Sequence, residues 1–294
     1  MWEKIALVGV GLLGGSLGLA VRERRLASRV VGYVRRQASV LECEQTGAVD
    51  TAGTELLQAV EGADLIVLCT PIAQMAELTT KLLPALKPGC IVTDVGSVKG
   101  SVVAELEPIV TSAKAHFIGS HPMAGAEKMG VLAARANLFE NAFCVVTPTP
   151  RTPAKLTARV EELWQSVGGR PLRLTPDLHD DLVSRSSHLP HVVAAELANY
   201  VLSPVHPKEQ GMLCATGFRD TTRIASGSPE MWRDISLANR KNLARVLGVF
   251  IEDLQEFQLA LENKDVKVIE EFFAKARERR DQWVGQAAAA TSPE

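Results

Sequence analysis

Three glycines near the N-terminus have the spacing of a phosphate-binding turn. Gly9, Gly11 and Gly14 form a G-x-G-x-x-G pattern directly after the apolar run Ile5–Val8. The first glycine permits a tight turn, the second lets the backbone approach a pyrophosphate, and the third lets the next helix pack closely against the strand. The bare N–H groups at the start of that helix then face the phosphates. We therefore predict a dinucleotide site; the alternative interpretation is a glycine-rich packing helix.

The second apolar run bears on which dinucleotide binds. In NAD-dependent enzymes an Asp or Glu about 20 residues beyond the glycines accepts a hydrogen bond from the ribose 2′-hydroxyl. Here the run ends in Val34, which cannot accept one, and Arg35 and Arg36 follow. Two guanidinium groups suit a 2′-phosphate, so the sequence favours NADP over NAD, unless both arginines are solvated loop residues. The expected cofactor-binding set further includes Leu12, Leu13, Thr70, Pro71 and Ser97.

Two loops carry residue types that suit catalysis. The segments Asp94–Lys99 and Gly119–Gly130 each follow an apolar run, and the second contains His121 directly before Pro122. A residue before proline is held in extended geometry, so His121 can point at a bound nicotinamide. A histidine there can accept a proton near neutral pH.

Apolar runs alternate with helical stretches over residues 1–174. Most of these runs are almost continuously apolar, as in strands that are buried on both faces. The alternation predicts an α/β fold, a doubly wound Rossmann-type sheet with an irregular far edge, as the dinucleotide-binding domain. The expected strands are Ile5–Val8, Val30–Val34, Asp64–Thr70, Cys90–Asp94, His116–Gly119, Ala142–Thr147 and Pro171–Leu174.

Beyond Thr175 the sequence predicts helices. Residues 175–285 form the expected all-α domain for substrate binding and dimerisation, and Pro190 interrupts its first helix, Asp177–Ser203. We expect residues 286–294 to be a frayed, disordered tail.

A long amphipathic helix is predicted within the all-α domain. Ser228 followed by Pro229 is typical of a helix start, and apolar residues then recur every three or four positions as far as Leu261. That helix would span about 33 residues, roughly 50 Å at 1.5 Å per residue. Its own domain is too small to cover it, so we expect a two-fold homodimer through the helical domain. The alternative is a helix broken near Gly248.

Composition and charge describe a globular protein with a substantial core. The chain has 294 residues, of which 46% are hydrophobic and 22% charged, and its net charge of −2 favours neither nucleic acid nor an anionic membrane. The longest uncharged run, Ile5–Val21, contains five glycines and is too short for a membrane span, and its flanks do not resemble a signal peptide. The five cysteines include no C-x-x-C pair, so we expect reduced core residues of a cytoplasmic protein.

Five longer motifs occur in the order found in one enzyme family. They are GVGLLGGS, DVGSVKG, GSHPMAGAEKMG, SHLPHVVA and GFRDTTRIASGSPEMWRDI, and the match runs from about residue 4 to residue 261. On these motifs the chain resembles the prephenate dehydrogenase family, which includes the arogenate and cyclohexadienyl dehydrogenases of tyrosine biosynthesis. We expect a stand-alone member, without a fused chorismate mutase segment or an added regulatory domain.

The resemblance implies oxidative decarboxylation of prephenate to 4-hydroxyphenylpyruvate, with hydride transfer to NAD(P). His121 matches the family's catalytic histidine, which accepts a hydrogen bond from the substrate hydroxyl, and Ser97 matches the serine that helps orient it. Arg223 matches the arginine that binds the ring carboxylate, and His191 matches a histidine that lines the substrate pocket. The positions that match a polar network at the pocket mouth are Glu127, Arg219 and Asp220.

Several of these residues also have a purely structural interpretation. Ser97 could cap the following helix, Arg223 could form a surface salt bridge, and we interpret Trp232 as an anchor for the long helix. His188 and His191 lie three residues apart but lack further ligands nearby, so we expect no metal site. The histidines interpreted as structural are His116, His179, His188 and His206.

Other functions remain open at this point. An arogenate dehydrogenase would form tyrosine directly by the same ring chemistry. A β-hydroxyacid dehydrogenase or imine reductase usually places a lysine, with an asparagine a few residues on, in the helix that enters the second domain, and here that helix has no lysine. A non-catalytic NADP-binding protein is disfavoured because His121 and Arg223 are both present. Tyrosine resembles the product and is therefore a candidate feedback ligand.

We predict that kcat/KM is higher with NADP than with NAD, and that replacing Arg35 and Arg36 together by alanine narrows the difference. The charge-assisted bonds to a 2′-phosphate would be lost with the guanidinium groups, whereas bonds to the shared pyrophosphate would remain. Steady-state rates of cofactor reduction with each dinucleotide measure this difference. A wild-type preference for NAD would contradict the roles given to Val34 and the two arginines.

Overall fold

The chain forms two compact units, Met1–Leu243 and Ala244–Glu294. A computed structural model describes residues 1–126 and 128–291. Within that part of the chain, no helix combines the length and the apolar character needed to cross a membrane.

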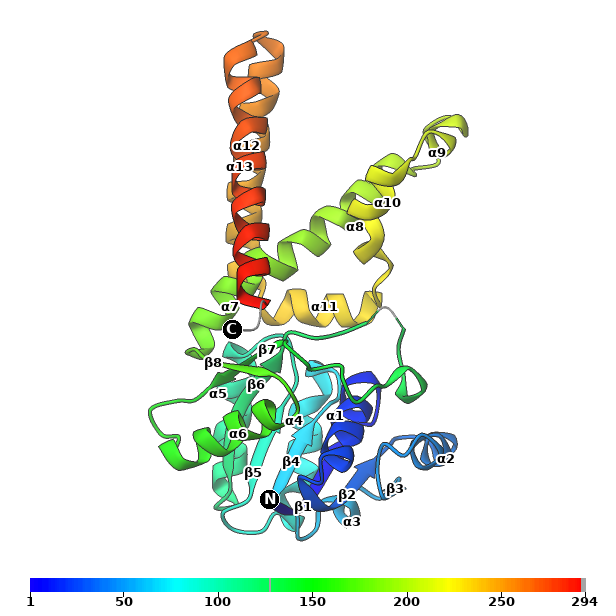
Figure 1. The fold of residues 1–294 in the computed structure, drawn as a ribbon, viewed down its shortest axis with the longest axis vertical. Coiled ribbons are helices and arrows are strands. Elements are labelled where there is room, and N and C mark those ends of the chain that lie inside the picture. Colours follow the sequence, from blue (N-terminus) through cyan, green and yellow to red (C-terminus); the bar gives the residue numbers. More distant parts are fainter. Residues whose placement is uncertain (127, 292–294) are drawn as a thin grey trace. The chain divides into compact units, whose positions relative to one another are not determined.

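The larger unit is built on an eight-stranded sheet with the order β3-β2-β1-β4-β5-β6-β7-β8 (Figure 1). The strands are β1 (Trp2–Val8), β2 (Ala27–Tyr33), β3 (Thr51–Gly53), β4 (Leu65–Leu68), β5 (Ile91–Asp94), β6 (His116–Pro122), β7 (Phe143–Thr147) and β8 (Arg170–Arg173). The first six strands are parallel, while β7 pairs antiparallel with β6 and β8 runs parallel to β7. This reversed pair is the irregular far edge. The predicted Rossmann-type fold is confirmed, since the order 3-2-1-4-5-6 is that of a doubly wound sheet.

Helices cover both faces of the sheet. They are α1 (Leu12–Glu23), α2 (Gln37–Gln45), α3 (Leu56–Val60), α4 (Ile72–Leu82), η1 (Leu83–Ala85), α5 (Gly100–Ser112), η2 (Val131–Ala133) and α6 (Ala154–Ser166). Successive residues of a strand point to opposite faces, so β1 sends Ile5 and Leu7 into one hydrophobic cluster and Ala6 and Val8 into another. Helices α1 and α6 pack into the first cluster, and α4 and α5 into the second.

Each expected strand is present, and β3 is an additional one. It has only three residues, Thr51–Gly53, all exposed or half-buried. Such a short edge strand has no apolar run by which periodicity could detect it.

The elements after the sheet are helical. They are α7 (Pro176–Val183), η3 (Ser184–His188), α8 (Leu189–Val201), α9 (Glu209–Met212), α10 (Thr216–Thr222), η4 (Arg223–Ser226) and α11 (Pro229–Ala238). The turn η3 is π-helical and ends two residues before Pro190. Proline has no N–H to donate, and its ring crowds the carbonyl four residues earlier, so the helix widens at this point. The larger compact unit extends beyond the sheet, through these helices, to Leu243.

The prediction of one helix from Pro229 to Leu261 is wrong. The start is as predicted, because the Ser228 side chain accepts a hydrogen bond from the Met231 N–H. However, α11 ends at Ala238, and α12 (Arg240–Glu262) begins after Asn239 and passes through Gly248 without a break. Asn239 is buried and its side-chain amide donates to the Asp180 carbonyl at 2.8 Å. A tertiary hydrogen bond therefore holds Asn239 at the break.

The smaller unit is a helical hairpin. The part of α12 from Ala244 onward is followed by α13 (Val266–Thr291), and Lys264 takes a φ of 55° in the turn between them. The ring of Phe257 on α12 lies 4.5 Å from that of Phe272 and 5.8 Å from that of Phe273 on α13. Since α13 extends to Thr291, the first residues of the expected tail are helical, and residues 292–294 lie outside the described residues.

Candidate active site

The glycine turn leaves an open approach to the start of α1. Gly9 has a φ of +96°, which glycine adopts readily, and its N–H donates to the Tyr33 carbonyl. A Cβ on Gly14 would overlap the Gly9 carbonyl oxygen, so this position allows the close approach of helix and strand. Gly11 is the N-cap of α1, and a Cβ built there would meet nothing within 4 Å. No side chain caps α1, so the N–H groups of Leu12 and Leu13 are available to phosphates.

Other predicted cofactor residues surround this turn at the carboxyl ends of neighbouring strands. Thr70 follows β4, and its hydroxyl oxygen is buried without a hydrogen-bond partner among the described residues. Pro71 is the N-cap of α4. Arg35 and Arg36 follow β2 and are exposed. Strands β2, β1 and β4 meet at the switch point of the sheet, where dinucleotides bind in this fold. The open turn and the unpartnered hydroxyl therefore fit a dinucleotide.

His121 lies near the end of β6, opposite Val145 of β7. Its side chain is buried, with 9% of the residue exposed, and its Nδ1 lies 2.9 Å from Nε2 of His179 on α7. Burial holds the pKa of His121 well below its ordinary value, and the nearby His179, Lys99 and His188 lower it further. His121 is therefore a neutral base at neutral pH.

A buried ion pair lies beside His121. Lys99 and Asp94 are both completely buried, and Nζ of Lys99 donates to the Asp94 carboxylate and, at 2.8 Å, to the Ser120 carbonyl. The same carboxylate accepts the N–H groups of Gly96 and Ser120 at 2.8 and 3.0 Å. These bonds hold the loop after β5 against the end of β6. The loop was predicted as a candidate, but pattern alone did not reveal this ion pair.

Sequence reasoning did not identify Asp180 and interpreted its neighbour His179 as structural. The Asp180 carboxylate on α7 accepts the N–H groups of Lys99 and Gly100 at 2.7 and 2.8 Å, at the start of α5. It also lies 2.8 Å from Nδ1 of His179. Close approach explains the glycine, because a Cβ on Gly100 would lie 2.8 Å from that carboxylate. The start of α5 has no side-chain cap of its own. A helix start without a capping residue was the signal that could have pointed to a carboxylate from elsewhere in the chain.

Ser97 lies in the same loop, half-buried. It does not cap the following helix, since Lys99 is the N-cap of α5. The buried His188 faces this loop, and its Nδ1 lies 3.2 Å from the Asn239 side-chain nitrogen. Burial lowers the pKa of His188 to about 4, although Asp180 opposes the shift.

The predicted substrate residues lie on the helices that follow. His191 on α8 stacks on Trp232 of α11 with ring centroids 3.8 Å apart, and its Nδ1 lies 2.9 Å from the Ser187 carbonyl. Trp232 thus supports His191 as well as α11. Helix α8 packs against both α10 and η4. Exposed side chains on α10 and η4 include Arg219, Asp220 and Arg223. Glu127 lies outside the described residues.

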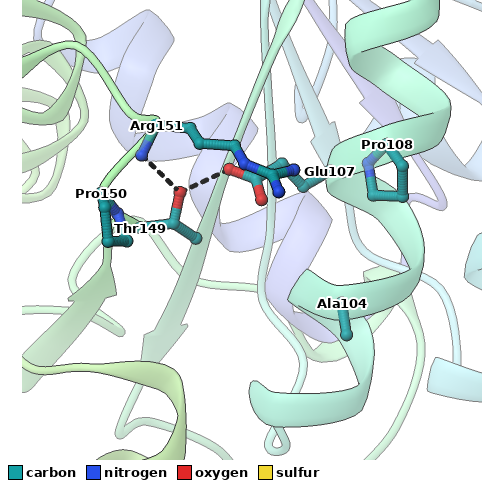
Figure 2. A pocket seen from close by; sticks show the side chains of 6 residues that line it. All are labelled: Ala104, Glu107, Pro108, Thr149, Pro150 and Arg151. Atoms are coloured by element: carbon teal, nitrogen blue, oxygen red, sulfur yellow. Dashed lines mark hydrogen bonds between the residues drawn. The ribbon is translucent and has the colours of Figure 1, made fainter.

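A surface pocket of about 430 Å³ lies elsewhere in the larger unit (Figure 2). It is lined by Ala104, Glu107 and Pro108 of α5 and by Thr149, Pro150 and Arg151 after β7. The Thr149 hydroxyl donates to the Glu107 carboxylate and accepts the Arg151 N–H at 3.1 Å. These bonds join the two segments of the pocket wall, and none of the predicted site residues lines the pocket. Among the described residues, no group of three or more His, Cys, Asp or Glu has the arrangement of a metal site.

Comparisons with known proteins identify the family. Residues 17–172 match the family model of the prephenate dehydrogenase nucleotide-binding domain, and residues 175–275 match that of the prephenate dehydrogenase dimerization domain. The chain belongs to the prephenate dehydrogenase family. It is therefore an NAD(P)-dependent oxidoreductase of the prephenate dehydrogenase type.

Individual members of the prephenate dehydrogenase family align over nearly the whole chain. The prephenate dehydrogenase of Bacillus subtilis is 32% identical over 287 residues, which are 96% of this chain and 76% of that protein. The structure of prephenate dehydrogenase from Aquifex aeolicus with hydroxyphenyl propionate and NAD⁺ has a TM-score of 0.89 and 31% identity, covering 95% of this chain and 98% of that one. Synechocystis arogenate dehydrogenase has a TM-score of 0.81 and 32% identity, covering 96% of this chain and all of that one, 100%.

We predict that stability falls as the pH drops from 6.5 to 4, and that His188→Gln makes this loss smaller. The pKa of His188 is about 4 in the folded protein against an ordinary 6.5, so between these values the unfolded chain binds a proton that the folded chain does not. The stability that depends on this shift is fully present above pH 6.5, and about 3 kcal/mol of it is lost by pH 4. Urea unfolding at a series of pH values measures it, with His206→Gln as the matched control. Equal pH slopes in wild type and His188→Gln would contradict the prediction.

Proposed function

We propose that this protein catalyses the NAD(P)-dependent oxidative decarboxylation of prephenate to 4-hydroxyphenylpyruvate. The observation that carries the proposal is His121, a buried, neutral imidazole at the carboxyl end of the sheet, whose Nδ1 is already engaged with His179. Its Nε2 is then the nitrogen that accepts the proton of the substrate hydroxyl. A base of this kind is what oxidation of a carbinol requires.

The proton accounting of the reaction suits one base. When bound, the dinucleotide supplies the hydride acceptor. As the carbinol carbon loses its hydride, its hydroxyl proton passes to Nε2 of His121. The ring carboxylate then leaves as carbon dioxide, and the electron pair of the broken C–C bond makes the ring aromatic. The former carbinol oxygen, now a phenolate, takes the proton back from His121. No net proton is released, so a single histidine that is shielded from water suffices.

The remaining predicted residues have proposed roles around this step. Arg223 would hold the ring carboxylate, since a guanidinium group can bind both carboxylate oxygens. His191, held in place by Trp232, would line the substrate pocket, and Ser97 would orient the hydroxyl and the nicotinamide. The proposed polar network at the pocket mouth comprises Glu127, Arg219 and Asp220.

Arogenate is the alternative substrate. It differs from prephenate in one side chain, alanyl in place of pyruvyl, and the ring chemistry at His121 is the same for both. For the cofactor we propose a preference for NADP, supported by the exposed Arg35 and Arg36 at the end of β2. Adding tyrosine to an assay of cofactor reduction tests whether it acts as the expected feedback ligand.

We predict that His121→Asn lowers kcat by about 10²–10⁴-fold, because that is the usual contribution of a positioned base. Binding of NAD(P) should be unchanged, since it depends on the glycine turn.

Arg223→Ala should instead act mainly on KM for prephenate, raising it by about one to two decades for a lost charge-assisted contact. Cofactor reduction with prephenate and arogenate offered separately measures all of these. Wild-type turnover in His121→Asn, or no reduction with either substrate, would overturn the proposed function.

The assembly we propose is a homodimer through the helical hairpin. Many apolar side chains of the hairpin are exposed in the single chain, among them Leu259 at 56% and Phe273 at 60%. An exposed apolar face of this kind is typical of an interface, and the matched dimerization domain of the family reaches residue 275.

Light scattering at micromolar concentration should therefore give about twice the chain mass of 31.7 kDa. A two-fold contact covers the exposed apolar face of the hairpin in both chains at once. Replacing Leu259 and Phe273 by serine should shift the mass toward one chain, whereas the same change at Leu41, exposed on α2, should not. A wild-type monomer would contradict this assembly.

A further inference from the structure

A buried relay of three side chains runs from the proposed base into the helix that follows the sheet. Nδ1 of His121 lies 2.9 Å from Nε2 of His179, and Nδ1 of His179 lies 2.8 Å from Oδ1 of Asp180. The two imidazole rings meet edge to face, at 73°. His179 is 0% exposed and Asp180 5%, so water does not compete for these bonds.

Two backbone donors hold the carboxylate of Asp180 in place. Its two carboxylate oxygens accept the N–H groups of Lys99 and Gly100 at the start of α5, a helix of thirteen residues. The positive end of a helix dipole stabilises an anion there. With these donors in place, the carboxylate acts toward His179 as a hydrogen-bond acceptor.

The donors and acceptors then determine the tautomer of each ring. An ionised carboxylate only accepts, so Nδ1 of His179 carries the hydrogen. A neutral His179 therefore has a bare Nε2, which can only accept. Nδ1 of His121 must then carry its hydrogen and donate it to His179. The consequence is that Nε2 of His121 has a lone pair.

The charges around the relay keep both rings neutral before the reaction. Burial lowers the pKa of His179, and the Lys99 ammonium lowers it further, while Asp180 and Asp94 oppose the shift. His121 faces His179, Lys99 and His188, each of which lowers its pKa beyond the effect of burial. When His121 takes up a proton at Nε2, its Nδ1 keeps the hydrogen bond to His179, so the ring does not need to reorient.

We propose that His179 and Asp180 are positioning residues that fix His121 in its Nδ1–H tautomer, with Nε2 directed to the substrate hydroxyl. This inference rests on the proposed function, because it assigns how the proposed base is prepared. The sequence interpretation of His179 as a structural residue is thereby replaced by a role that acts through His121.

The tautomer can be measured without any turnover. In free wild-type enzyme labelled with ¹⁵N-histidine, long-range ¹H–¹⁵N spectra at pH 7.5 should show His121 protonated at Nδ1, with its signals assigned by their loss in His121→Asn. A His121 protonated at Nε2 would overturn the proposal. If the tautomer is as proposed but neither prephenate nor arogenate is oxidised, the relay stands and the proposed function fails.

Variants of His179 separate positioning from packing. His179→Leu removes the acceptor and should lower kcat by about 10²-fold, within the range of a mispositioned base, with KM for prephenate and the Kd of NAD(P) within about threefold of wild type. His179→Gln keeps a carbonyl acceptor and should restore at least about tenfold of that loss. His116→Gln, at the start of β6, is the matched control and should behave as wild type. Wild-type kcat in His179→Leu, or equal losses in the Leu and Gln variants, would overturn the proposal, and if His179→Leu fails to fold the wild-type spectra decide alone.

Discussion

The carboxylate of Asp180 on α7 joins the start of α5 to the side chain of His179. It accepts the backbone N–H groups of Lys99 and Gly100, which begin α5, and it accepts from His179 next to it. Its own backbone carbonyl accepts the Asn239 side chain, at the point where α11 ends. Three elements distant in sequence thus meet at one residue. Removing a buried carboxylate of this kind leaves several donors without partners, which costs far more than an average hydrogen bond contributes.

A second buried charge is compensated nearby. Lys99 and Asp94 would be costly to bury alone, but each of their polar atoms is hydrogen-bonded within the pair or to Ser120 and Gly96. Burial lowers the pKa of the Lys99 amine, while Asp94 raises it. Pairs of this kind add little net stability. Their effect here is positional and electrostatic: the ammonium lies beside two imidazoles and favours their neutral forms.

The site is assembled from strand ends on one side and helices on the other. The glycine turn after β1 and the hydroxyl of Thr70 after β4 form the proposed dinucleotide side, while His121 at the end of β6 faces α7. The same edge of a parallel sheet gathers these residues because all of these strands end there. The reversed strands β7 and β8 close the sheet beyond His121 and help bury it. This arrangement explains how His121 can be buried while the glycine turn stays open.

Features that local pattern encodes could be predicted from the sequence. Apolar runs predicted each of the larger strands, glycine spacing predicted the turn at Gly9, and a recognisable motif pointed to His121, because these signals lie within a few neighbouring residues. Which distant side chains meet depends on how the chain folds. His121 and His179 are 58 residues apart and Lys99 and Asp180 are 81 apart, and no periodicity encodes such a pairing. The helix end at Asn239 is likewise not encoded locally: a hydrogen bond to Asp180, 59 residues away, holds it there, and neither glycine nor proline marks the position.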